Sequence, residues 1–237
     1  MRRLGAIRTG GGWTAPRTIG ALALIAALAM PSGRGEAHPH VFIDGALSLI
    51  FDDQGRLAAL RIGWSYDEFY SLVMIEDKGL DADGDGTPEP AQLEAFAGND
   101  VDWAAGFPGD VTLMRDGAAV TLKGPVRHRA YFENGRIVTT HVRPLSAPLD
   151  LGEGNVMAQL YDPSFFVAYD VPALPTIEGA EGCAVTRQDA DTDKAYEEYG
   201  DKLASVDIGE DPYVEVDLGD IGVLFADRFI VTCAAPS

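Results

Sequence analysis

The chain has 237 residues, only two cysteines and a formal net charge of −19 at pH 7. A surface this acidic repels nucleic acids and anionic membranes and attracts cations, so we expect no nucleic-acid partner. The length is enough for one good hydrophobic core or two small ones.

The N-terminal residues have the pattern of a secretory signal peptide, residues 1–37. Basic residues precede an apolar run over residues 19–30, and the small residues Gly35 and Ala37 follow it. The run has about half the length needed to cross a bilayer, so a retained membrane helix is the weaker alternative. We predict cleavage after Ala37, a periplasmic location and one β-rich domain over residues 38–237.

Apolar residues at every second position predict that residues 41–51 form a strand with one buried face. These residues are Val41, Ile43, Leu47, Leu49 and Phe51. Because side chains alternate between the faces of a strand, His38, His40 and Asp44 then share the opposite face. A turn leads into a second strand over residues 56–64, which we expect to pair with the first.

A helix–loop–helix insertion is predicted at about residues 67–98. Phe69 and Leu72 recur at helical spacing after Asp67, which can cap the helix. We expect this apolar stripe to face the core. A short second helix is expected over residues 91–96.

The loop between these helices resembles the first half of a calcium-binding EF-hand loop. Carboxylates stand at loop positions one, three and five, and a glycine at position six allows the sharp turn around the ion. The second half departs from that pattern, because Pro88 stands at position eight and the neutral Gln92 at position twelve. The predicted calcium ligands are Asp81, Asp83, Asp85, Thr87, Glu89 and Gln92. The alternative is an acidic turn that binds no ion.

The segment Asn134-Gly135 predicts a tight hairpin within residues 126–142, because both central residues of a type I′ turn need positive φ. Counting back from this turn puts His128 opposite His141. Direct cross-strand partners have Cβ atoms about 4.5–5.5 Å apart, so the two imidazoles can close on one metal ion.

The four histidines of the chain therefore fall into two pairs that can each chelate a metal. Neutral imidazoles suit zinc, nickel, cobalt and copper, and four of them, or three with a carboxylate, complete the coordination. Pro39 excludes the square-planar mode that needs a deprotonated amide at the second residue. The predicted transition-metal ligands are His38, His40, His128, His141 and Asp44. The alternative is an exposed N-terminal pair and a hairpin pair that merely stacks.

The rest of the chain is predicted to contain more strands and one polar helix. Strands are expected over residues 156–161, 164–171 and 183–187, and the helix over residues 191–203. Residues 110–122 are expected to form β structure that turns at Asp116-Gly117, and residues 221–233 run into a closing strand. We expect the strands at 156–161 and 164–171 to pair through a turn at Asp162-Pro163. The predicted fold class is α+β, mostly antiparallel and sandwich-like, with two or three short helices.

Cys183 and Cys233 are expected to form a disulfide, which is the default for a lone pair of cysteines in an exported protein. Free or metal-binding thiols are the minority alternative. The sequence contains few motifs typical of enzymes. We find no glycine-rich phosphate loop, nucleophile elbow or Cys-x-x-Cys pair. We expect no catalytic activity, and a metal-dependent hydrolase or a copper oxidase that uses the His38 amine is a lesser alternative.

Six dispersed segments also occur in one known family. They are His38-Pro39-His40-Val41-Phe42-Ile43-Asp44, Asp67-Glu68-Phe69-Tyr70, the loop at residues 81–86, Thr139-Thr140-His141, Tyr161-Asp162-Pro163 and Phe225-Ala226-Asp227. On these segments the sequence resembles the exported bacterial proteins of the domain-of-unknown-function family numbered 1007. The resemblance implies the periplasmic component of an uncharacterised ABC-type transport system, with an association with nickel and cobalt permeases and with zinc-responsive gene clusters. Gln92 departs from the glutamate that the family usually has at this position.

The leading hypothesis is a periplasmic protein that captures or delivers zinc, nickel or cobalt for a membrane metal permease or ABC-type transporter. Protonation of the histidines would release such a metal below about pH 6. A second hypothesis, from a different class, is a calcium-stabilised interaction or scaffold module without a transition-metal role.

Overall fold

The structure is a computed structural model that describes residues 39–152, 154–204 and 219–234. These residues belong to one compact unit. The predicted signal peptide and His38 lie outside the described residues, so the expectations about them stay predictions.

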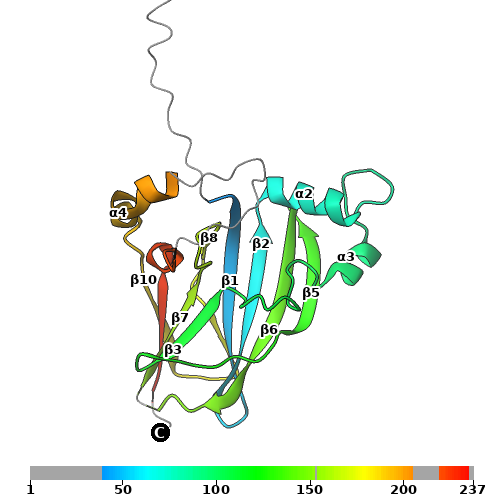
Figure 1. Ribbon diagram of the computed structural model, residues 1–237. Coiled ribbons are helices and arrows are strands. Elements are labelled where there is room, and N and C mark those ends of the chain that lie inside the picture. The colour runs from blue at the N-terminus through cyan, green and yellow to red at the C-terminus, as the bar shows by residue number, and fades with distance from the viewer. Residues whose placement is uncertain (1–38, 153, 205–218, 235–237) are drawn as a thin grey trace, which may run out of the picture. The chain divides into compact units, whose positions relative to one another are not determined.

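The first of two β-sheets has the strand order β5-β6-β2-β1-β8 (Figure 1). The short β9 pairs with the other end of β1. Its strands are β1 (Val41–Phe51), β2 (Leu57–Tyr66), β5 (Val126–Glu133), β6 (Arg136–Leu149), β8 (Val167–Asp170) and β9 (Thr176–Glu178). Strands β8 and β9 run parallel to β1, and the other neighbours are antiparallel.

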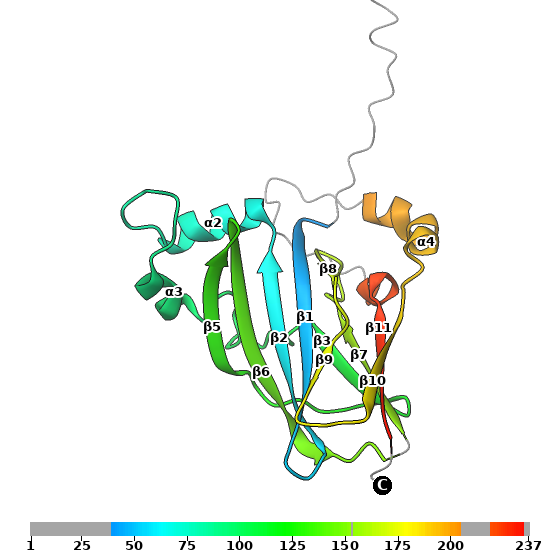
Figure 2. The same cartoon turned by 180° about the vertical axis from the view of Figure 1, so that it is seen from behind.

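The second sheet has the order β10-β11-β7-β3-β4 and is antiparallel throughout. Its strands are β3 (Val111–Arg115), β4 (Ala118–Ala119), β7 (Asn155–Leu160), β10 (Cys183–Gln188) and β11 (Arg228–Cys233). Figure 2 shows the two sheets from behind. Side chains of both sheets share one hydrophobic core, with Leu49 and Leu60 from the first sheet and Val156 and Phe229 from the second. The predicted α+β fold class, mostly antiparallel and sandwich-like, is confirmed.

The predicted alternation in the first strand is also confirmed. In β1 the odd positions from Val41 to Phe51 are buried and the even positions are not. One face of this strand therefore belongs to the core, and the other is at least partly open to solvent.

The predicted pairing of residues 156–161 with residues 164–171 is wrong. Strand β7 lies between β11 and β3, whereas β8 lies beside β1 in the other sheet. The buried carboxylate of Asp162 accepts the N–H groups of Ser164 and Val167, each at 2.9 Å. These bonds hold a turn that carries the chain from one sheet to the other instead of reversing it within one sheet.

Helix α2 (Glu68–Lys78) has the predicted ends. The Asp67 carboxylate accepts the N–H of Tyr70 at 2.8 Å, and Gly79 ends the helix with φ 60°. A side-chain cap at the first turn and a left-handed residue at the end satisfy backbone groups that the helix itself leaves unpaired.

The face of α2 that meets the core differs from the prediction. Phe69 is 74% exposed and Leu72 is 58% exposed, while the helix buries Ser71, Met74 and Ile75. The Ser71 hydroxyl accepts the N–H of Ile137 in β6 at 2.9 Å and donates to the carbonyl of Tyr66 at 3.3 Å. These two bonds fix the rotation of the helix, so helical spacing alone did not identify the buried stripe.

The other helical elements are short. They are α3 (Pro90–Phe96), α4 (Thr192–Ala204) and the 3-10 helix η1 (Gly222–Phe225). Helix α4 lies within one residue of the predicted helix at 191–203. Of the helices in the described part of the chain, none has the length and apolar character needed to cross a bilayer.

The predicted disulfide between Cys183 and Cys233 is present. The two residues are direct partners at one end of the β10–β11 pairing. The bond therefore ties the last strand to its neighbour across a sequence separation of 50 residues.

The contact between α2 and β6 can be tested with Ser71→Ala. The substitution leaves the buried N–H of Ile137 without its acceptor, so we expect the free energy of unfolding to fall by about 1–3 kcal/mol. Equilibrium urea denaturation measures this change. The exposed Ser146→Ala is the control and should change the free energy by less than about 0.5 kcal/mol. Equal effects of the two substitutions would contradict the proposed contact.

Candidate functional site

The loop between α2 and α3 brings three carboxylates together. One oxygen atom from each of Asp81, Asp83 and Glu89 lies within 4.8 Å of the other two. Among the described histidine, cysteine, aspartate and glutamate residues, no other group of three has ligand atoms this close. Converging carboxylate oxygens are the ligands that hard cations such as calcium prefer.

Backbone N–H groups of the loop hold these carboxylates in place. The two oxygens of Asp81 accept the N–H groups of Gly84 and Gly86, each at 2.8 Å. Glu89 accepts the N–H of Ala82 at 3.0 Å. Glu89 is also the residue that immediately precedes α3. The loop thus orders its acidic groups through its own backbone.

The structure brings together some of the predicted calcium ligands and separates others. Positions one, three and nine of the loop converge, whereas Asp85 accepts the N–H of Thr87 at 2.8 Å and lies outside the group. Gln92 lies in the first turn of α3, because Pro90 starts this helix directly after Glu89. The ligand roles of Thr87 and Gln92 stay predictions.

The predicted hairpin is present between β5 and β6, with Glu133 opposite Arg136. The regular pairing stops at Arg129, because a bulge separates it from the pairing of Val126 with Val142. His128 lies in this bulge. Its ring nevertheless stacks beside the ring of His141, with centroids 6.0 Å apart and an interplanar angle of 28°.

His141 lies inside an aromatic cluster. Its ring centroid is 4.8 Å from that of Trp64 and 5.0 Å from that of Trp103. Only 2% of the residue is exposed, and its Nε2 atom has no hydrogen-bond partner among the described residues. Burial, with smaller contributions from the charges of Arg143 and His128, lowers the pKa of His141 to about 3. The ring is therefore neutral at physiological pH.

Trp103 is a site residue that sequence reasoning missed. It lies in the loop that follows α3, where no periodic pattern marks a residue that packs against the core. The guanidinium of Arg143 lies 5.7 Å from its ring centroid and donates to the carbonyl of Lys123 at 2.8 Å. Gly98, just after α3, allows the close packing of His128, since a Cβ atom there would lie 2.7 Å from the His128 Cγ.

His40 lies far from the hairpin histidines. Strand pairing aligns His141 with Ile62 and Ile62 with Leu47, which is seven positions beyond His40. At about 3.3 Å per residue, these positions separate them by about 23 Å along the sheet. The ring of His40 instead packs against Phe166, with centroids 4.9 Å apart, and burial lowers the pKa of His40.

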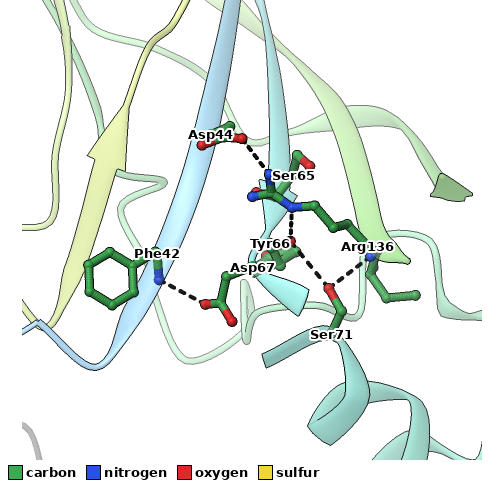
Figure 3. Close-up of polar contacts among 8 residues, drawn as sticks. Phe42, Asp44, Ser65, Tyr66, Asp67, Ser71 and Arg136 are labelled. Carbon is green, nitrogen blue, oxygen red and sulfur yellow. Dashed lines mark hydrogen bonds and ion pairs between the residues drawn. The ribbon is translucent and has the colours of Figure 1, made fainter. Parts of the chain in front are cut away.

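Asp44 contacts an arginine (Figure 3). Its Oδ2 atom accepts a hydrogen bond from Nη1 of Arg136, whose other nitrogens donate to the carbonyls of Ser65 at 2.7 Å and Tyr66 at 2.5 Å. Asp44 lies at an unburied position of β1, whereas His141 lies on the buried face of β6. The two residues therefore occupy opposite faces of the sheet.

The structure accordingly does not bring the predicted transition-metal ligands into one site. Among the described members of that set, only His128 and His141 are neighbours. The separation follows from strand register, which places His40 at one end of β1 and His141 near the middle of β6. The contribution of His38 falls outside the described residues.

Comparison with known proteins gives one family and no individual relative. The model of a family described as "Protein of unknown function (DUF1007)" matches residues 23–233. No curated protein and no solved structure matches the chain.

The buried neutral histidine predicts a specific pH dependence in the metal-free protein. The unfolded chain binds a proton at His141 near pH 6.5, and the folded chain does so only near the folded pKa of about 3. Stability is therefore lost as the pH falls from 6.5 towards 3, and this group alone should contribute about 2–3 kcal/mol of the loss by pH 4.5.

His141→Phe keeps an aromatic ring and removes the titrating group. We expect the free energy of unfolding of this variant to depend less on pH between 6.5 and 4.5 than that of the native chain. Urea denaturation at both pH values, with a chelator present, measures the difference. Identical pH dependences would show that His141 titrates normally in the folded protein.

Proposed function

We propose a function for this chain, which belongs to the DUF1007 family. The protein is an exported metal-ion-binding accessory of a membrane transporter and has no catalytic role. The observation that carries the proposal is the convergence of the Asp81, Asp83 and Glu89 carboxylates. The strongly acidic composition supports it, because such a surface attracts cations.

The acidic loop favours calcium over a softer ion. Its three converging groups offer only oxygen atoms, and calcium accepts six to eight oxygen ligands, including water molecules and backbone carbonyls. Three protein carboxylates leave several positions for water. We therefore expect weak binding, with a Kd of about 10⁻⁴–10⁻³ M, as in extracellular calcium modules.

The transition-metal part of the proposal depends on His128 and His141. Their rings are neighbours, and the neutral ring of His141 keeps a buried nitrogen without a hydrogen-bond partner among the described residues. Two imidazoles bind zinc, nickel or cobalt only together with other ligands, such as water or a group supplied by a partner. Such an incompletely coordinated ion suits transfer to a permease or an ABC-type transporter, which we propose as the partner.

Calcium binding can be tested with the mature chain, residues 38–237. The double variant Asp81→Asn/Glu89→Gln removes two of the three converging charges, so we expect its calcium affinity to fall at least about tenfold, equivalent to about 1.4 kcal/mol. Isothermal titration calorimetry measures this change. The calcium-induced rise in melting temperature should shrink in parallel.

The control is Asp53→Asn, which removes one negative charge instead of two and lies in the exposed turn between β1 and β2. It should leave calcium affinity within about twofold of the native value, equivalent to about 0.4 kcal/mol. Equal losses in the control and the double variant would point to general surface charge and reject the loop as the site.

Transition-metal binding can be tested with His128→Gln, a partly exposed position. We expect the affinity for zinc or nickel to fall at least about tenfold, or about 1.4 kcal/mol, while His40→Gln leaves it unchanged. Unchanged affinity in His128→Gln would reject the hairpin pair. Loss in both variants would instead support the single shared site that the sequence predicted. Elemental analysis of the protein purified from its own periplasm identifies the resident ion.

A further inference from the structure

Helix α3 and β5, the edge strand of the first sheet, lie side by side (Figure 1). Residues of both elements line a large groove. Its volume is about 1060 Å³, and residues of α3, β5, β6 and β2 line it. Pockets for small organic ligands measure about 300–1,000 Å³. The groove therefore has room for an organic molecule rather than a single ion.

The lining of the groove is rich in arginine for so acidic a chain. Arg61, Arg127 and Arg129 all line it, although the chain has 37 acidic residues and only 18 lysines and arginines. Glu94 and Glu133 line it as well. The cations thus outnumber the carboxylates in this groove, in contrast to the surface as a whole.

Two of these guanidinium groups are available to a ligand. Arg61 forms an ion pair with Glu178. For Arg127 and Arg129, the described part of the chain shows no ion pair, and both residues are exposed. Because a guanidinium can bind a carboxylate through two parallel hydrogen bonds, a pair of free arginines suits a ligand with two carboxylates.

The backbone at Arg127 adopts a conformation that is unusual for arginine. Its φ is 58°, in the left-handed region that residues other than glycine and asparagine seldom adopt. It lies in the bulge of β5, and bulges often redirect side chains next to binding and active sites. Glycine would fit this conformation without strain, so the presence of arginine here points to a use for its side chain.

The groove also offers apolar and aromatic surface. Leu93 of α3 and Ala97, the residue after α3, line it together with Phe132 and Tyr131 of β5, and Tyr131 is 38% exposed. A simple inorganic anion would leave this surface unused. We propose that the groove binds a small organic anion that carries two or more carboxylates on an apolar or aromatic body.

This groove is separate from the calcium-binding loop of the proposed function, but His128 and His141 of the transition-metal proposal also line it. The anion is held by Arg127 and Arg129, and calcium by the loop at residues 81–89. The calcium and anion proposals can fail independently, because each has its own ligands, probes and variants. The transition-metal proposal is tested apart from the anion by zinc or nickel binding to His128→Gln.

Titration of the ¹⁵N-labelled mature chain followed by NMR is the first test. We use citrate and phthalate as dicarboxylate or tricarboxylate probes and inorganic phosphate as the comparison anion. The expected result is saturable shifts of the backbone amides of β5 with citrate or phthalate, and affinity for phosphate at least tenfold weaker. No saturable shift with any probe, or equal affinity for phosphate, would overturn the assignment.

Substitution at the strained position is the second test. Arg127→Gly should lower affinity for the bound carboxylate at least tenfold, yet leave the melting temperature unchanged or raised because glycine relieves the strain. Arg129→Gln should lower affinity by a similar factor. Arg228→Gln, an exposed arginine of β11, is the matched control and should bind as the native chain does. Native affinity in both Arg127→Gly and Arg129→Gln would overturn the proposal.

Discussion

The antiparallel pairing of β2 with β6 is the constraint on which the rest of the structure depends. This pairing joins two halves of the first sheet. Strands β2, β1 and β8 form the half that packs on the second sheet, and β6 and β5 form the half that lies beside α2 and α3. The pairing also sets the register in which His141 faces Ile62 and Trp64 faces Thr139. The aromatic cluster and the separation of the histidines both follow from this one alignment.

The same alignment explains why the types of residue in the sequence did not predict the metal site. Their positions along the paired strands decide which of them can meet. Imidazoles at His40 and His141 have suitable chemistry, but a rigid sheet holds them at different places along neighbouring strands. The acidic loop differs, because its ligands are local in sequence and a single turn can gather them. A site within one loop can be predicted from the conformation of a few neighbouring residues. A site shared between strands can be predicted only when the register of every intervening strand pair is known.

Sequence patterns identified most of the fold. Alternation identified β1, the Asn134-Gly135 turn identified the β5–β6 hairpin, and Asp67 and Gly79 gave the ends of α2. These features depend on backbone chemistry within a few residues.

The failures involve contacts between segments that are distant in sequence. The rotation of α2 depends on a bond from Ser71 to Ile137, and the sheet change after β7 depends on the buried carboxylate of Asp162. For the candidate sites, the EF-hand-like pattern predicted three loop carboxylates that do converge, Asp81, Asp83 and Glu89. No sequence pattern indicated Trp103 or the groove. Irregular loops and groove walls have no periodicity that a sequence pattern can detect.

Helix α3 has one further consequence. It begins immediately after Glu89, and its side chains Leu93 and Glu94 line the arginine-containing groove. A cation held by the loop and an anion held in the groove would therefore act on the same two turns of helix. Thermodynamic linkage requires any such coupling to be reciprocal, so that each ion alters the affinity of the other by an identical factor. A short helix between two sites of opposite charge preference would make the release of one ligand respond to the other.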